Sequence, residues 1–134
     1  MVPHDGGGTR GRSADLDALP AGLAGQSLSR TAIILPLDAA LEAIALRTGD
    51  NRRLENWEGW VRMPDGGRAK SLSHGGSFAL PQDATRAAAA AAAGMKRAQL
   101  RWERDPEYEH AALYFGLTFG AAAAAGDASS VSPG

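Results

Sequence analysis

Apolar and polar positions alternate most regularly in HAALYFGLTFG, residues 110–120. This period of two is typical of a strand with one buried face. The face expected to be buried holds Ala111, Leu113, Phe115, Leu117 and Phe119. The opposite face holds Ala112, Tyr114, Gly116 and Thr118. We therefore predict a strand whose leucines and phenylalanines supply much of the core.

A second alternating stretch, WEGWVRM at residues 57–63, predicts another strand. One face of this strand carries Trp57, Gly59, Val61 and Met63, and the other carries Glu58, Trp60 and Arg62. Residues 64–67 read PDGG, in which proline presets one backbone angle and Asp-Gly tolerates positive φ. We predict a hairpin, with RAKSLSH (68–74) as its weaker second arm.

Residues 83–105 change to a helical period. Asp83 suits the helix start, alanine favours helix, and the residue before Pro106 is pushed out of helical conformation. The stripe expected to pack on the sheet contains Ala84, Ala88, Ala91, Met95, Ala98 and Trp102. The opposite side carries Arg86, Arg97, Arg101 and Arg104. We predict an amphipathic helix whose alanines allow close approach to the sheet.

Apolar positions from Leu37 to Arg47 also recur at helical spacing, which predicts a shorter helix. Before it, TAIIL at residues 31–35 is rich in β-branched residues and predicts a short strand. This segment could instead lead straight into the helix.

The expected fold class is α+β: a small antiparallel sheet with two helices on one face. With the strand at 31–35 the order is βαββαβ, the ferredoxin-like order; without it the order is αββαβ. One domain is expected over residues 30–119. Residues 1–29 and the Ala/Gly/Ser tail at 120–134 hold too few large apolar side chains to order themselves, so we expect both ends to be disordered.

Composition excludes several classes of protein. The chain has no cysteine, so disulfides and thiolate metal sites are ruled out. The N-terminus lacks the apolar stretch of a secretory signal, and no apolar run approaches the ~20 residues of a membrane span. We expect a soluble, cytoplasmic protein that does not enter membranes. Charge is uneven: the net charge is −2 over residues 1–51, +5 over 52–104 and −4 over 105–134.

No motif indicates an enzyme, a cofactor or a metal site. His4, His74 and His110 lack the paired spacing of metal ligands. HGGSF (74–78) is best explained as a turn, and GGRAKS (66–71) lacks the spacing of a phosphate-binding loop. The carboxylates after the long helix fit a solvated loop better than an acid–base pair. These are Glu103, Asp105, Glu107 and Glu109.

Two surfaces are candidates for binding. The first is the sheet face opposite the helices, where we expect an interface with a protein partner. Its residues are Trp60, Arg62, Tyr114 and Thr118. Aromatics beside arginine also occur on sheets that stack RNA bases, although RAKSLSH lacks the aromatic pattern of those domains. Alternatively, the N-terminal segment simply covers Trp60 and Tyr114.

The second surface is the arginine row of the long helix, which could meet the phosphates of a nucleic acid or stay solvated. Its residues are Arg86, Arg97, Arg101 and Arg104. The leading hypothesis from sequence is a small non-enzymatic interaction or accessory domain that self-associates through its sheet face. The alternative is a nucleic-acid-binding protein that uses the arginine row.

Overall fold

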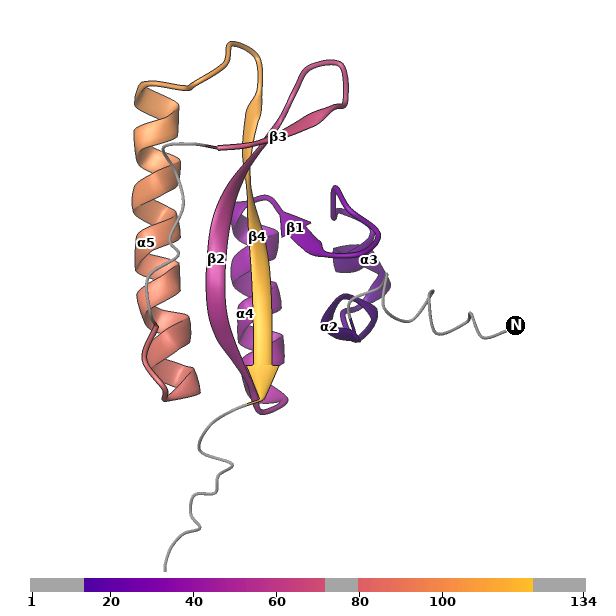
Figure 1. Ribbon diagram of the computed structural model, residues 1–134, viewed down its shortest axis with the longest axis vertical. Helices are drawn as coiled ribbons and strands as arrows, with labels where there is room; N and C mark the ends of the chain where they lie inside the picture. The colour runs from indigo at the N-terminus through magenta and orange to yellow at the C-terminus, as the bar shows by residue number, and fades with distance from the viewer. Residues whose placement is uncertain (1–13, 72–79, 122–134) are drawn as a thin grey trace, which may run out of the picture.

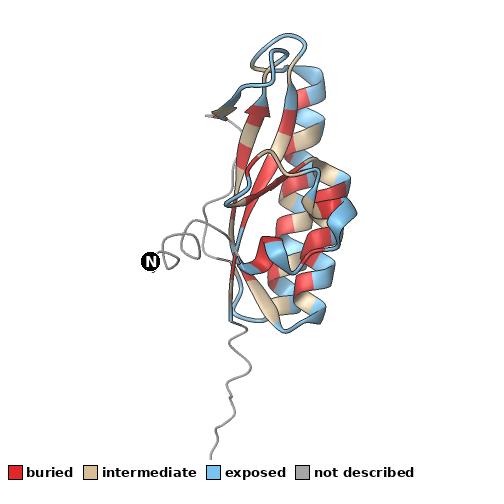
Figure 2. Cartoon of the chain, turned by 90° about the vertical axis from the view of Figure 1, so that its right-hand side faces the viewer, coloured by how far each residue is buried: buried red, intermediate tan, exposed pale blue. Residues whose placement is uncertain are grey.

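The computed structural model describes residues 14–71 and 80–121. These residues form two layers, an antiparallel sheet of four strands and two helices packed on one of its faces (Figures 1 and 2). The elements in chain order are α2 (Ala14–Asp17), α3 (Ala21–Ala24), β1 (Ile33–Leu35), α4 (Leu37–Gly49), β2 (Arg52–Arg62), β3 (Arg68–Lys70), α5 (Ala84–Arg104) and β4 (Ala112–Ala121). The predicted α+β class is confirmed.

The strand predicted at 31–35 is present as β1, so the sheet elements follow the βαββαβ order. Their spatial order is β1-β4-β2-β3, which makes β4 and β2 the central strands. Ferredoxin-like sheets instead place their first and third strands in the centre. The resemblance to that fold is therefore limited to the order of the elements along the chain.

The paired strands β2 and β4 contribute many of the buried side chains of the core. Leu54, Trp57 and Val61 of β2 lie opposite Phe119, Leu117 and Leu113 of β4, and all six are buried. Phe115 is fully buried, and its ring lies 5.7 Å from that of Trp57. The alternation predicted for both strands is confirmed, with Trp57 on the helix side and Trp60 on the other. Figure 2 shows this buried layer between sheet and helices.

Helix α5 begins as predicted, because the carboxylate of Asp83 accepts a hydrogen bond from the backbone N–H of Arg86 at 3.0 Å. Its packing stripe differs slightly from the prediction. The buried residues are Ala87, Ala91, Met95, Ala98 and Trp102, whereas Ala84 and Ala88 are only half-buried. The stripe enters the core one turn after the helix start. Helix and sheet approach so closely that a Cβ added to Gly94 would lie 2.9 Å from the indole of Trp57.

The ordered domain begins earlier in the chain than the predicted start at residue 30. We expected residues 1–29 to be disordered, yet residues 14–29 contain α2 and α3 and place three leucines in the core. These are Leu16, Leu19 and Leu23. The two short helices lie beside β1, on the opposite side of the molecule from α5 (Figure 1). Residues 1–13, 72–79 and 122–134 lie outside the described part, and Gly120 and Ala121 of the expected tail belong to β4.

Asp15 fastens this segment to the domain. Its side chain is 10% exposed and accepts hydrogen bonds from Arg47 at the end of α4 and from both Nε and Nη2 of Arg52, each at 3.0 Å. Burial is the largest single effect on the pKa of Asp15 and raises it, but the hydrogen bonds and charges of Arg52 and Arg47 together outweigh burial. The pKa therefore lies below its ordinary value, and the ionised carboxylate contributes to folding.

Several element limits also differ from the prediction. Strand β2 begins at Arg52, five residues before the expected start, and a bulge at Glu55 interrupts its pairing with β4. Strand β3 covers only Arg68–Lys70, and residues 72–74 of the predicted arm 68–74 fall outside the described residues. Helix α4 continues to Gly49, and Asn51 then reverses the chain with a φ of 66°.

Candidate interaction surface

The helix-free face of the sheet is built from every second residue of the central strands. Trp60 of β2 lies directly opposite Tyr114 of β4, and Arg62 lies opposite Ala112. On the other side of β2, Lys70 is opposite Trp60 and Arg68 is opposite Arg62. This arrangement places two aromatic side chains side by side in the middle of the face with cations along one edge.

Trp60 lies flat against the sheet. A Cβ added to Gly116 would lie 2.9 Å from the indole Nε1 and 3.0 Å from Cδ1, so the indole covers the position where any larger residue would place its side chain. The Nε1–H donates a hydrogen bond to Glu58 Oε2 at 3.1 Å. The guanidinium carbon of Arg68 lies 5.7 Å from the ring centroid, within cation–π range. The indole is held by the strand below, the carboxylate at its edge and the guanidinium beside it.

Charge on this face is mostly positive. Lys70 Nζ lies 2.9 Å from Glu58 Oε1, so the carboxylate that accepts from the indole is also paired with a cation. Arg62 and Arg68 are exposed, and neither forms an ion pair with any described residue. The face therefore offers two guanidinium groups next to Tyr114 and the fixed indole of Trp60.

The N-terminal segment borders this face. Leu28 N–H donates to Ile34 O at 2.9 Å, and Ser27 Oγ accepts from Ile34 N–H at 3.0 Å, so the outer edge of β1 is paired. Arg68 Nη1 donates to Leu28 O at 2.8 Å, which joins the far hairpin to this segment. Trp60 and Tyr114 are half-buried in this arrangement.

The four sheet residues named from sequence do share one face, but they do not form one cluster. Trp60, Arg62 and Tyr114 are neighbours, whereas Thr118 pairs with Asn56, four residues along β4 from Tyr114. Sequence reasoning missed Arg68, Lys70 and Glu58 as members of the cluster. The PDGG turn sets the hairpin register. With that register, Arg68 could have been placed beside Arg62, and Lys70 beside Trp60, from the sequence alone.

The arginine row of α5 is solvent-exposed along its length. Arg86, Arg97, Arg101 and Arg104 are all exposed. No carboxylate in the described part of the chain forms an ion pair with any of them. Arg97, Arg101 and Arg104 are spaced i, i+4 and i+7, so they lie along one side over about 10 Å of helix.

The other chemistry-bearing residues are dispersed. His110 is exposed and has a φ of 62° where the chain enters β4. Of the four carboxylates predicted to lie after the long helix, Glu103 is still within α5; Glu107 accepts a hydrogen bond from Ser71 Oγ at 2.6 Å, and the other three are exposed. Within residues 14–71 and 80–121, no three His, Asp or Glu side chains gather as a metal site would require. His4, His74 and the HGGSF segment lie outside these ranges.

No protein-family model matches this chain, and no curated protein or solved structure has significant similarity to it. Among the described helices, none is both long and apolar enough to cross a bilayer.

Proposed function

We propose that this protein is a small non-enzymatic interaction domain that self-associates through its helix-free sheet face. The observation that carries the proposal is the Trp60–Tyr114 cross-strand pair flanked by Arg62 and Arg68 on a face without helices. Tryptophan, tyrosine and arginine are the residues most enriched at the energetic centres of protein interfaces.

The fixed geometry of the indole supports this use. Trp60 is already held by Gly116, Glu58 and Arg68, so it loses little side-chain entropy when a partner covers it. Rigid aromatic anchors of this kind contribute area at low entropic cost.

A second copy of the chain is the partner we propose, because two arginines without a carboxylate partner among the described residues and one exposed carboxylate lie at opposite ends of the face. Arg62 and Arg68 lie at the hairpin end of β2, and the exposed carboxylate of Glu55, which lies 3.9 Å from Arg53 Nη2 of its own chain, is near the other end. A two-fold axis through the middle of the face brings the arginines of one copy to Glu55 of the other.

Light scattering after size exclusion tests this proposal. The wild type is expected to have twice the mass of the chain, and Trp60→Ala and Arg62→Glu are each expected to shift it toward the mass of one chain. Leu100→Ala serves as the control, because Leu100 is 59% exposed on α5, in the other layer. A monomeric wild type, or a dimer that neither sheet variant weakens, rules the proposal out.

A second candidate function is supported by the arginine row. Four exposed arginines that lack carboxylate partners in the described structure fit a polyanion such as a nucleic acid. Fluorescence anisotropy with single-stranded RNA and duplex DNA over a salt series tests this candidate. Replacing Arg97, Arg101 and Arg104 with Gln should lower both the affinity and the salt slope, whereas Arg62→Gln should leave them unchanged. Absence of binding at low salt excludes it.

A further inference from the structure

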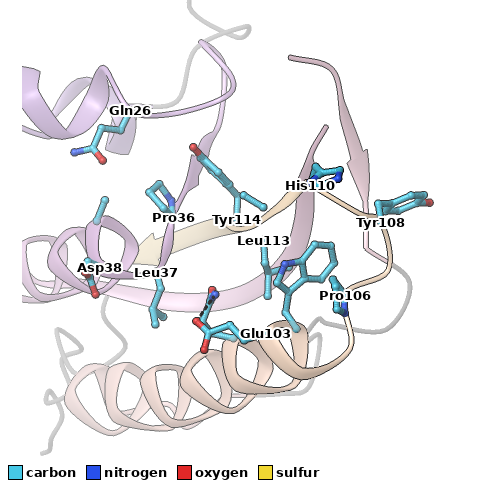
Figure 3. Close-up of a pocket in the computed structure, with 15 residues that line it drawn as sticks. Gln26, Pro36, Leu37, Asp38, Glu103, Pro106, Tyr108, His110, Leu113 and Tyr114 are labelled. Carbon is cyan, nitrogen blue, oxygen red and sulfur yellow. Dashed lines mark hydrogen bonds between the residues drawn. The ribbon is translucent and has the colours of Figure 1, made fainter. Parts of the chain in front are cut away.

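A groove of about 760 Å³ opens at one end of the domain, beside the helix-free sheet face that carries Trp60. It lies where the start of α4, the end of α5 and the first residues of β4 meet (Figure 3). Glu103 enters it from α5, whereas Tyr114 and His110 lie on the opposite side, beyond Leu113 (Figure 3). The groove shares Ala112 and Tyr114 with the helix-free face of the sheet.

The strand lengths explain why the groove exists. Strand β1 ends at Leu35, opposite Phe115, and Pro36 then turns the chain into α4. Strand β4 extends further, pairing with β2 as far as Ala112. The start of β4 therefore has a neighbouring strand on the β2 side and none on the β1 side among the described residues.

This open side retains backbone groups for a partner. In an antiparallel ladder, the N–H and C=O groups of successive residues point alternately to the two neighbours. Ala111 therefore points its groups to the same side as Phe115, toward the groove. No backbone hydrogen bond in the described structure involves Ala111, and this residue is half-buried, whereas Leu113 is only 3% exposed. Ala111 is the accessible pairing point.

The lining is aromatic and acidic. Tyr108 is 41% exposed at the groove, and Tyr114, His110 and Trp102 also line it. Asp38 and Glu103 supply two carboxylates, and no lysine or arginine of residues 14–71 and 80–121 lines the groove. Aromatic faces and carboxylates are the two kinds of group that bind ammonium and guanidinium ions.

The two carboxylates differ in their surroundings. Glu103 Oε2 accepts a hydrogen bond from Gln99 Nε2 at 3.1 Å, drawn as the dashed line in Figure 3. Asp38 lies in the first turn of α4, where it also complements the positive end of the helix. Neither forms an ion pair with a cation of the described residues. The loop that follows α5 adds Asp105 and Glu109, both exposed.

We infer that this groove binds an extended basic peptide segment of a partner protein. The segment lies beside the start of β4, pairs with the backbone of Ala111, and places a lysine or arginine between the aromatic rings and the carboxylates of Asp38 and Glu103. Adding a short strand to an open edge is a common mode of peptide recognition. Charge complementarity selects the basic partner.

Titration of ¹⁵N-labelled full-length protein with the peptide acetyl-Lys-Val-Arg-Val-Lys-amide tests the inference. The amide signals of residues 108–114, together with those of Asp38 and Glu103, are expected to shift with peptide concentration. A neutral analogue, with citrulline for arginine and norleucine for lysine, is expected to bind at least about tenfold more weakly. Glu103→Gln should lower the affinity for the basic peptide about 3- to 10-fold.

Glu42→Gln is the matched control. Glu42 is exposed on α4, one turn beyond Asp38, and does not line the groove, so its removal changes net charge but should leave affinity unchanged. Trp60→Ala should also leave affinity unchanged, which separates this test from that of self-association. Equal affinity for the neutral peptide, shifts centred on Trp60, or no shift at millimolar peptide overturns the inference. Equal affinity for free arginine amide overturns the extended-peptide part.

Discussion

Gly116 is the position that tests how Trp60 is held on the helix-free face. Replacing Gly116 with alanine adds one methyl group directly beneath the indole, 2.9 Å from Nε1 and 3.0 Å from Cδ1. Glu58 Cγ is also near, at 3.2 Å, but its side chain can move because it is only half-buried. The substitution therefore forces the indole away from the strand.

Two opposing effects set the change in the free energy of unfolding caused by Gly116→Ala. Glycine inside a strand costs about 0.5–1 kcal/mol relative to alanine, so Gly116→Ala would stabilise the protein if the space were empty. Overpacking beneath a ring held on several sides costs about 1–3 kcal/mol. We expect net destabilisation of about 0–2.5 kcal/mol, with a central value of about 1 kcal/mol, from these two ranges.

The sign is tested with a double-mutant cycle measured by urea denaturation. In the Trp60→Ala background the added methyl group meets no indole, so Gly116→Ala should become stabilising by up to about 1 kcal/mol. The two sites would then be coupled by more than about 1 kcal/mol. Equal effects of Gly116→Ala in both backgrounds would falsify the placement of the indole.

Three further predictions concern the other face and the N-terminal segment. Gly94→Ala should lower stability by about 1 kcal/mol despite better helix propensity, because the methyl group meets Trp57; a higher melting temperature contradicts this. Ala91→Leu should cost about 1–3 kcal/mol in the same denaturation assay, and an unchanged midpoint would place the stripe elsewhere. The lowered pKa of Asp15 contributes stability that is complete above the pKa of the unfolded state and is lost as pH falls through the folded value. Asp15→Asn should therefore be less stable than wild type at neutral pH, and this difference should shrink below about pH 5; a gap that persists at low pH contradicts the ion-pair account.

Local periodicity was sufficient to predict the sheet and the long helix. The two strands of the central ribbon alternate cleanly because one face packs on helices, and that alternation placed Trp57 beneath α5 and Trp60 on the opposite face. The element order followed from the same patterns. The strand order did not, since pairing between segments far apart in sequence leaves no trace in local periodicity.

The N-terminal segment was missed for a related reason. Its helices are four residues each, too short to show an amphipathic period, and their leucines become useful only when α4 and β1 are already in place. Asp15 bonds arginines 32 and 37 residues away, and nothing in the local sequence predicts that contact.

The aromatic residues of the helix-free face could be predicted from alternation in the sequence, whereas the charged residues beside them on β3 could not. Trp60 and Tyr114 follow from alternation, whereas Arg68 depends on the hairpin register and on its bond to Leu28. The groove was not predictable from the sequence. It exists because β1 pairs with β4 only as far as Phe115, whereas β2 pairs with β4 as far as Ala112.

We propose that the helix-free sheet face with Trp60 joins two copies of this chain. The most direct measurement is the molar mass by light scattering of wild type and Trp60→Ala across a concentration series. We expect a dimer for the wild type and a monomer for the variant, with both proteins folded by circular dichroism. A wild type that stays monomeric at the highest concentration, or a variant that dimerises equally well, contradicts it.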